Sequence, residues 1–146
     1  RASRTWRDMP EPAARTVLAF DFGIKRIGVA VGEPELGTAH PLPGIAAAGE
    51  ARFAAIGRLV AQWKPARLVV GLPLAANGSA HDTTQRAARF ARQLHGRFHL
   101  PVELVDERYT SVEAAQRLRG RRAARLAIDS VAAQLILEQY FDARAA

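Results

Sequence analysis

Apolar residues form short continuous runs in the first third of the chain and recur at helical spacing afterwards. Residues 17–22 and 27–31 are almost entirely apolar, which predicts two buried strands. The four residues between them can reverse the chain in a hairpin turn. Residues 37–45 alternate weakly and contain two prolines, which cannot donate to a sheet ladder, so this third strand is expected at an edge. Three successive strands with short connections predict an antiparallel meander.

Helical stripes then alternate with short apolar runs. Apolar residues at positions 53, 56, 60 and 63 form one stripe, and Pro65 ends that helix. The pattern further predicts a strand at 67–71, a helix from Asp82 to about His95, a strand at 102–105 and a last helix from about Leu126 to Phe141. Thr110 and Glu113 resemble a capping box that opens a short helix before the last one. The inward faces of the second and last helices are expected to comprise Ala87, Phe90, Ala91, Leu94, Ile128, Val131, Ala132, Leu135 and Ile136.

The predicted order of elements is β-β-β-α-β-α-β-α-α, an α/β pattern. Helical crossovers imply parallel pairing of the later strands, so we expect a five-stranded mixed sheet flanked by helices. Residues 1–15 are polar and contain two prolines, and we expect them to be a flexible N-terminal extension of a single domain at 16–142. Ligands of such sheets lie beyond the carboxyl ends of the parallel strands.

Three acids fall where this architecture would bring them to that edge. Asp21 and Glu107 end apolar strands, and Asp129 lies near the start of the last helix. Each acid also has an ordinary alternative. Asp21 could cap the hairpin turn through its own backbone. Glu107 or its neighbour Asp106 could form a surface ion pair with Arg108. Asp129 could interact favourably with the positive N-terminal end of its helix. Adjacent acids at a strand end point to opposite faces, so we choose Glu107 and keep Asp106 as an auxiliary.

Together the three acids predict a magnesium site. Carboxylate oxygens contributed by three separate elements are the ligands that magnesium prefers. One or two such ions can activate a water molecule and stabilise the leaving oxygen of a phosphodiester. The candidate catalytic and metal-binding residues are therefore Asp21, Glu107 and Asp129.

The charge of the chain points to a polyanionic partner. The 146 residues carry a net charge of +7, with an isoelectric point near 11.1, and basic surfaces bind phosphate backbones. Arginine-rich composition and an ordinary solvated face are the alternatives. The candidate nucleic-acid contacts are Lys25, Arg26, Arg86, Arg108, Arg119, Arg121, Arg122 and Arg125. There is no cysteine, which excludes disulfides and thiolate zinc sites, and no apolar run is long enough to span a membrane.

Four segments resemble the motifs of one known family. They read D-F-G-I-K-R-I-G-V-A-V, V-V-G-L-P-L-x-x-N-G-S, V-D-E-R-Y-T-S-V-E-A and I-D-S-V-A-A-Q-L-I-L-E-Q-Y-F-D, in this order. The chain resembles the YqgF-type, or RuvX, family of pre-16S rRNA nucleases and Holliday junction resolvases from about residue 16 to 142. The resemblance implies an RNase H-like fold, with the acidic triad of the family on Asp21, Glu107 and Asp129.

The same resemblance implies a cytoplasmic nuclease that uses magnesium or manganese and acts on structured RNA or branched DNA. Symmetrical cutting of a junction would suit a homodimer. One departure is Asn77, where the family commonly has an acid, so any metal or substrate contact of that acid is in question. Two other classes remain open: a nucleic-acid-binding or ribosome-maturation factor without turnover, and a phosphotransferase with an acid-and-glycine hairpin. The latter would need two such domains.

Overall fold

The computed structural model describes residues 15–72, 82–106 and 125–145. Its elements are β1 (Val17–Asp21), β2 (Ile27–Glu33), β3 (Thr38–Ile45), α1 (Glu50–Trp63), β4 (Arg67–Leu72), α2 (Asp82–Phe98), β5 (Val102–Asp106) and α4 (Arg125–Ala145). The expected capping box at Thr110 and Glu113 lies outside these residues. No helix of the described part is long and apolar enough to cross a bilayer.

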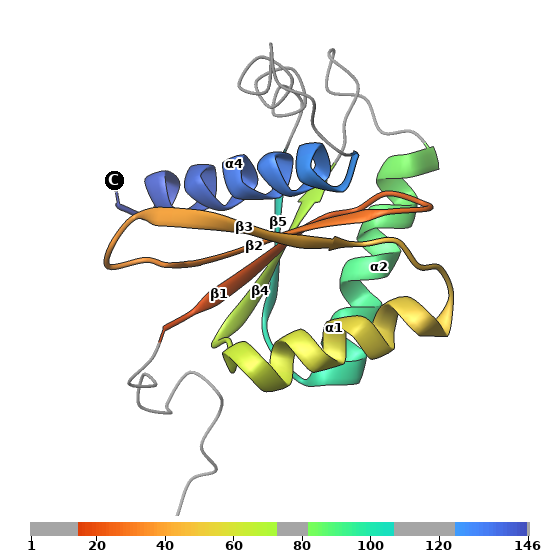
Figure 1. The fold of residues 1–146 in the computed structure, drawn as a ribbon. Helices are drawn as coiled ribbons and strands as arrows, with labels where there is room; N and C mark the ends of the chain where they lie inside the picture. The colour runs from red at the N-terminus through yellow and green to blue at the C-terminus, as the bar shows by residue number, and fades with distance from the viewer. Residues whose placement is uncertain (1–14, 73–81, 107–124, 146) are drawn as a thin grey trace, which may run out of the picture.

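The strands form one mixed sheet in the order β3-β2-β1-β4-β5. β1 pairs antiparallel with β2 and parallel with β4, while β2–β3 is antiparallel and β4–β5 parallel. The predicted meander, the two parallel strands and the edge position of the proline-containing strand are confirmed. Helix α4 covers one face of the sheet, and α1 and α2 cover the other (Figure 1).

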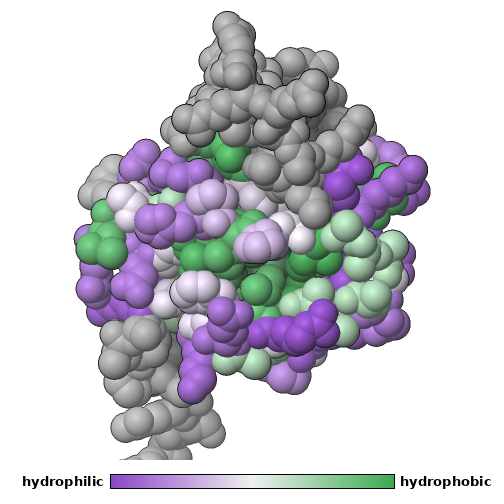
Figure 2. All heavy atoms as spheres, viewed as in Figure 1, coloured by the Kyte–Doolittle hydropathy of each residue, from purple (hydrophilic) through white to green (hydrophobic). Residues whose placement is uncertain are grey.

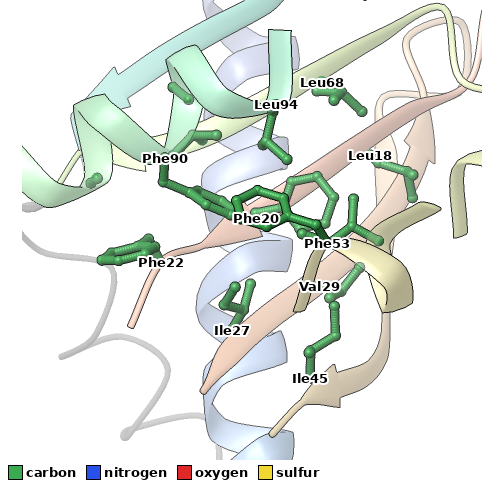
Figure 3. Packing of buried hydrophobic residues seen from close by; sticks show 14 of the residues in the cluster. Leu18, Phe20, Phe22, Ile27, Val29, Ile45, Phe53, Leu68, Phe90 and Leu94 are labelled. Carbon is green, nitrogen blue, oxygen red and sulfur yellow. The ribbon is translucent and has the colours of Figure 1, made fainter. Parts of the chain in front are cut away.

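The face of the sheet under α1 and α2 carries the larger part of the core. Alternate residues of β1 point to it, including Leu18 and Phe20, both fully buried. Phe90 of α2 lies at the centre of an aromatic group (Figure 3), with its ring centroid 5.1 Å from that of Phe22 and 6.0 Å from that of Phe53. The inward positions predicted for α2 are all buried, namely Ala87, Phe90, Ala91 and Leu94. Seen from outside, apolar residues occupy the middle of the view and hydrophilic residues mostly its margins (Figure 2).

The opposite face is built from small side chains that let α4 approach closely. The strands contribute Val17, Ala19, Ala30, Ala39 and Val69 to this cluster. At Gly32 an added Cβ would lie 2.5 Å from the carbonyl oxygen of Thr38 and 3.0 Å from the ring of Phe141, so only glycine fits there without displacement of β3. Close packing of this kind makes the position of α4 sensitive to single atoms.

The contact face of α4 differs in part from the predicted stripe. Ala132, Leu135 and Ile136 are buried as expected. However, Ala132 and Leu135 form a small cluster of their own, and the sheet is contacted by residues that the prediction omitted, Ala133, Leu137, Tyr140 and Phe141. The helix is apolar on more than one side, so periodicity could not indicate which side meets the sheet. The side chain of Ile128 lies outside the described part.

Helix α2 also extends beyond its predicted end. Gly96 is tolerated inside the helix, which continues to Phe98. His99 then adopts a left-handed conformation, with φ of 55°, and its N–H donates to the carbonyl of His95 at 3.0 Å. A left-handed residue of this kind is a common way to end a helix.

Candidate active site

Asp21 lies at the carboxyl end of the central strand, between two glycines. In the ladder it pairs with Gly28 of β2 and with Gly71 of β4, and Gly71 in turn pairs with Val105 of β5. The parallel strands β1, β4 and β5 therefore end together at one edge of the sheet. Because neither cross-strand neighbour of Asp21 has a side chain, a ligand or a phosphate group can approach its half-buried carboxylate closely.

The alternation of side chains along the strands places Asp21 on the face that α4 covers. Val17 and Ala19 of β1 pack in the α4 cluster, and Leu18 and Phe20 pack on the other side. Asp21 follows in the same alternation as Val17 and Ala19. On β5, Val105 packs against the α4 cluster as well, so the exposed Asp106 alternates to the opposite face.

Helix α4 runs antiparallel to β1 and brings its first turns to the edge where Asp21 lies. Near its start, the hydroxyl of Ser130 accepts a hydrogen bond from the N–H of Val29 at 3.3 Å, one residue from the Gly28 partner of Asp21. Near its end, the hydroxyl of Tyr140 accepts one from Arg67 at 3.0 Å, at the first residue of β4. The helix thus crosses the sheet from the carboxyl edge to the opposite edge.

Of the three predicted acids, Asp21 lies within the described residues, Asp129 is described only in its backbone, and Glu107 is not described. Asp129 belongs to α4, immediately before Ser130, and its backbone therefore lies at the edge that holds Asp21. The side chain of Asp129 and the whole of Glu107 lie outside the described residues. Within 15–72, 82–106 and the side chains described in α4, no three potential ligands gather around a metal position. The membership of the triad stays a prediction.

Two of the predicted basic contacts lie beside Asp21. Lys25 and Arg26 occupy the turn between β1 and β2, where Lys25 is exposed and Arg26 half-buried. Arg86 is exposed on α2 and forms an ion pair with Asp82 at 3.1 Å, which offsets part of its charge. Arg125 belongs to α4, but its side chain is outside the description. The other predicted contacts lie outside the described residues, namely Arg108, Arg119, Arg121 and Arg122. Asn77 lies outside them as well.

Arg52 is a basic residue of this region that the sequence pattern did not indicate. Its Nη2 donates to the carbonyl of Ile24 at 2.6 Å, and its guanidinium carbon lies 5.4 Å from the centre of the Phe22 ring. Its Nε is buried without a hydrogen-bond partner, and burial lowers the pKa of the guanidinium. Arg52 therefore braces the turn that follows Asp21. Only the contact between α1 and this turn reveals it, and no motif contains it.

The chain is similar to known proteins along most of its length. Residues 15–143 match the family profile described as RuvX, Holliday junction resolvase. A relative from Methylobacillus flagellatus is 56% identical over 142 residues, which are 92% of this chain and 97% of the relative. A relative from Dechloromonas aromatica is 56% identical over 132 residues, 87% of this chain and 90% of its own. Both carry the provisional name pre-16S rRNA nuclease.

Solved structures share the fold at low sequence identity. RuvC of T. thermophilus in complex with a Holliday junction substrate superposes with a TM-score of 0.57 at 16% identity, over 90% of this chain and 96% of that one. The yeast mitochondrial Holliday junction resolvase Ydc2 gives a TM-score of 0.57 at 14% identity, over 94% of this chain and 82% of that one. The RNase H-like architecture expected from the resemblance is confirmed.

Proposed function

This chain belongs to the RuvX family, and on that premise we propose that it is a metal-dependent nuclease that hydrolyses phosphodiester bonds. The observation that carries the proposal is the place of Asp21. It stands at the end of the central strand, between two glycines, at the edge where α4 begins. A half-buried carboxylate whose cross-strand neighbours lack side chains, next to a turn with two basic residues, suits a metal ion that meets a phosphate group.

We propose Asp21, Glu107 and Asp129 as the residues that hold the metal. All three offer hard oxygen ligands, which magnesium and manganese prefer. Asp21 lies on the α4 face, and the alternation along β5 makes Glu107 rather than Asp106 the acid expected on that face. A bound divalent ion, alone or in a pair, would supply an activated water and stabilise the charge that develops on the leaving oxygen.

The basic residues near Asp21 are proposed to bind and orient the nucleic acid. Lys25 and Arg26 lie in the turn directly after Asp21, so a phosphate held by them is brought to the carboxylate. Contacts of this type hold the backbone without reading the base sequence. Arg86, Arg108, Arg119, Arg121, Arg122 and Arg125 are the further candidates for phosphate contacts.

Two substrate classes follow from the relatives. The relatives in Methylobacillus and Dechloromonas are named for pre-16S rRNA, and the RuvC neighbour was solved with a Holliday junction. We therefore propose structured RNA, such as the 5′ region of pre-16S rRNA, or branched DNA as the substrate. Symmetrical cutting of a junction would require two copies of the chain.

The substitution Asp21→Asn tests the proposal. Purified protein is incubated with manganese and either a 5′-extended pre-16S fragment or a synthetic four-way DNA junction, side by side. We expect the variant to lose cleavage by at least about 100-fold while it still binds the substrate, because the amide removes a metal ligand and a charge that repels phosphate.

Asp142→Asn is the matched control, because Asp142 is an exposed aspartate in the last turns of α4, far from the Asp21 edge. It should cleave like the wild type. Cleavage by Asp21→Asn at the wild-type rate would remove Asp21 from the mechanism. Tight binding by the wild type without cleavage of either substrate would instead favour a binding or maturation factor.

A further inference from the structure

Ser130 is a buried hydroxyl that joins α4 to two strands of the sheet. It is only 2% exposed. Its Oγ accepts a hydrogen bond from the N–H of Val29 at 3.3 Å and donates to the carbonyl of Leu42 at 2.6 Å. A serine hydroxyl has one proton to donate and lone pairs to accept with, so both capacities are used by the backbone of β2 and β3.

The hydroxyl fills an irregularity in the ladder. Ile27 pairs with Ile45, but Val29 pairs with Leu42, so β3 has one more residue than β2 in this interval. Bulges of this kind leave backbone groups without their regular partners. Ser130 supplies a partner to one donor and one acceptor next to the irregularity, which would otherwise be buried without hydrogen bonds at a cost in stability.

The same contact links the strand that pairs with Asp21 to the backbone of Asp129, and both acids are predicted to hold the metal. Val29 follows Gly28, which pairs with Asp21 in the β1–β2 ladder. On the helix, Ser130 directly follows Asp129. The path from Asp21 to Asp129 therefore runs through one register pair, the peptide unit between Gly28 and Val29, one side-chain hydrogen bond, and the peptide unit between Ser130 and Asp129.

We propose that Ser130 is a positioning residue, which holds the first turns of α4 against β2 and β3 so that Asp129 and Asp21 stand at the separation a shared divalent ion requires. This role rests on the nuclease function proposed above. Catalytic constellations tolerate displacements of only about 0.5 Å. Partners that orient metal ligands typically contribute about 10–100-fold to metal affinity or activity.

Gln134 provides an internal comparison one turn further along α4. Its Nε2 donates to the carbonyl of Ala39 at 2.9 Å, so it also ties the helix to the backbone of β3. Ala39 pairs with Gly32, toward the other end of β2 from Gly28. Loss of this tie should weaken the packing of α4 without displacing the turn that carries Asp129.

The test compares Ser130→Ala with Gln134→Ala and with Ser130→Thr, which keeps the hydroxyl. Mn²⁺ binding is measured by the electron paramagnetic resonance of free Mn²⁺, cleavage as a function of Mn²⁺ concentration, and stability by urea unfolding. We expect Ser130→Ala to bind Mn²⁺ about 10-fold more weakly and to need about 10-fold more Mn²⁺ for half-maximal cleavage. Gln134→Ala should stay within about 2-fold of the wild type in both, although it is destabilised, and Ser130→Thr should recover most of the loss.

Each outcome decides between the alternatives. If Ser130→Ala and Gln134→Ala lose similar stability and both bind Mn²⁺ like the wild type, Ser130 is only structural and the inference is overturned while the nuclease function stands. If the wild type neither binds Mn²⁺ nor cleaves, the proposed function fails and the role of Ser130 fails with it. Should Ser130→Ala not fold, Ser130→Cys is close in size but a weaker hydrogen-bonding group, and its Mn²⁺ affinity must then fall below that of Ser130→Thr.

Discussion

Replacing Phe90 with alanine should remove the centre of the core between the sheet and its two covering helices. Phe90 is 2% exposed, and its ring meets three others, those of Phe20 at 6.2 Å and edge-on, Phe22 at 5.1 Å and Phe53 at 6.0 Å. Phe20 belongs to β1, Phe22 directly follows that strand, and Phe53 belongs to α1. Because these rings are held by different segments, they cannot collapse together into the space left behind. Truncations of this kind cost about 3–5 kcal/mol, and we expect about 4 kcal/mol here.

This loss is a large part of the total stability, which for a domain of this size is about 5–15 kcal/mol. With an m-value of about 2 kcal/mol/M, the urea midpoint should fall by roughly 2 M. Phe98→Ala is the matched control, since Phe98 is only partly buried at the end of the same helix, and its midpoint should fall by less than half as much. An equal fall for both variants, or a fall below about 0.5 M for Phe90→Ala, would refute the reasoning.

Two further predictions concern polar contacts at opposite edges of the sheet. Burial, reinforced by a hydrogen bond with Glu103, raises the pKa of Tyr140 above its ordinary value of 10.0; the folded state then keeps a proton that the unfolded state releases. The contribution of Tyr140 to the free energy of unfolding is complete below about pH 10 and is lost as the pH rises further. The free energy of unfolding should therefore fall more steeply between pH 10 and 11 in the wild type than in Tyr140→Phe. Parallel curves for the two proteins would contradict this. Arg52→Ala should accelerate amide hydrogen exchange about 10-fold or more in residues 24–26, because a hydrogen bond from a charged donor contributes roughly 1.5–3 kcal/mol; Arg58→Ala, an exposed change in the same helix, should leave that exchange unchanged.

The order of elements could be predicted because each strand and helix has its own local signal. Continuous apolar runs identify β1 and β2 as buried strands, and the prolines of β3 identify it as an edge strand. The apolar stripe of α1 identifies it as a helix. Helix α4 shows where such reasoning ends. Its sequence is apolar on several sides, and the side that meets the sheet depends on small residues of other strands, such as Ala19, Ala30 and Gly32.

The places of two candidate residues in the fold were predictable to a similar degree, while their role as metal ligands stays a prediction. Asp21 stands at the strand end that its sequence indicated, and Asp129 lies on the helix whose start comes to the same edge. Ser130 and Arg52 were not predictable, because each acts on a backbone group that is distant along the chain. Ser130 contacts a strand 101 residues earlier, and Arg52 contacts a carbonyl 28 residues earlier. Their function depends on the register of the sheet and the packing of the helices.

The outer strand β3 is also poorly suited to recruit a strand from another molecule. Pro41 and Pro43 carry no N–H, so an intruding chain would lack donors at these positions. The carbonyls of Ala39 and Leu42 already accept hydrogen bonds from side chains of α4. Intermolecular sheet extension, the first step of many aggregation reactions, is therefore disfavoured at this margin.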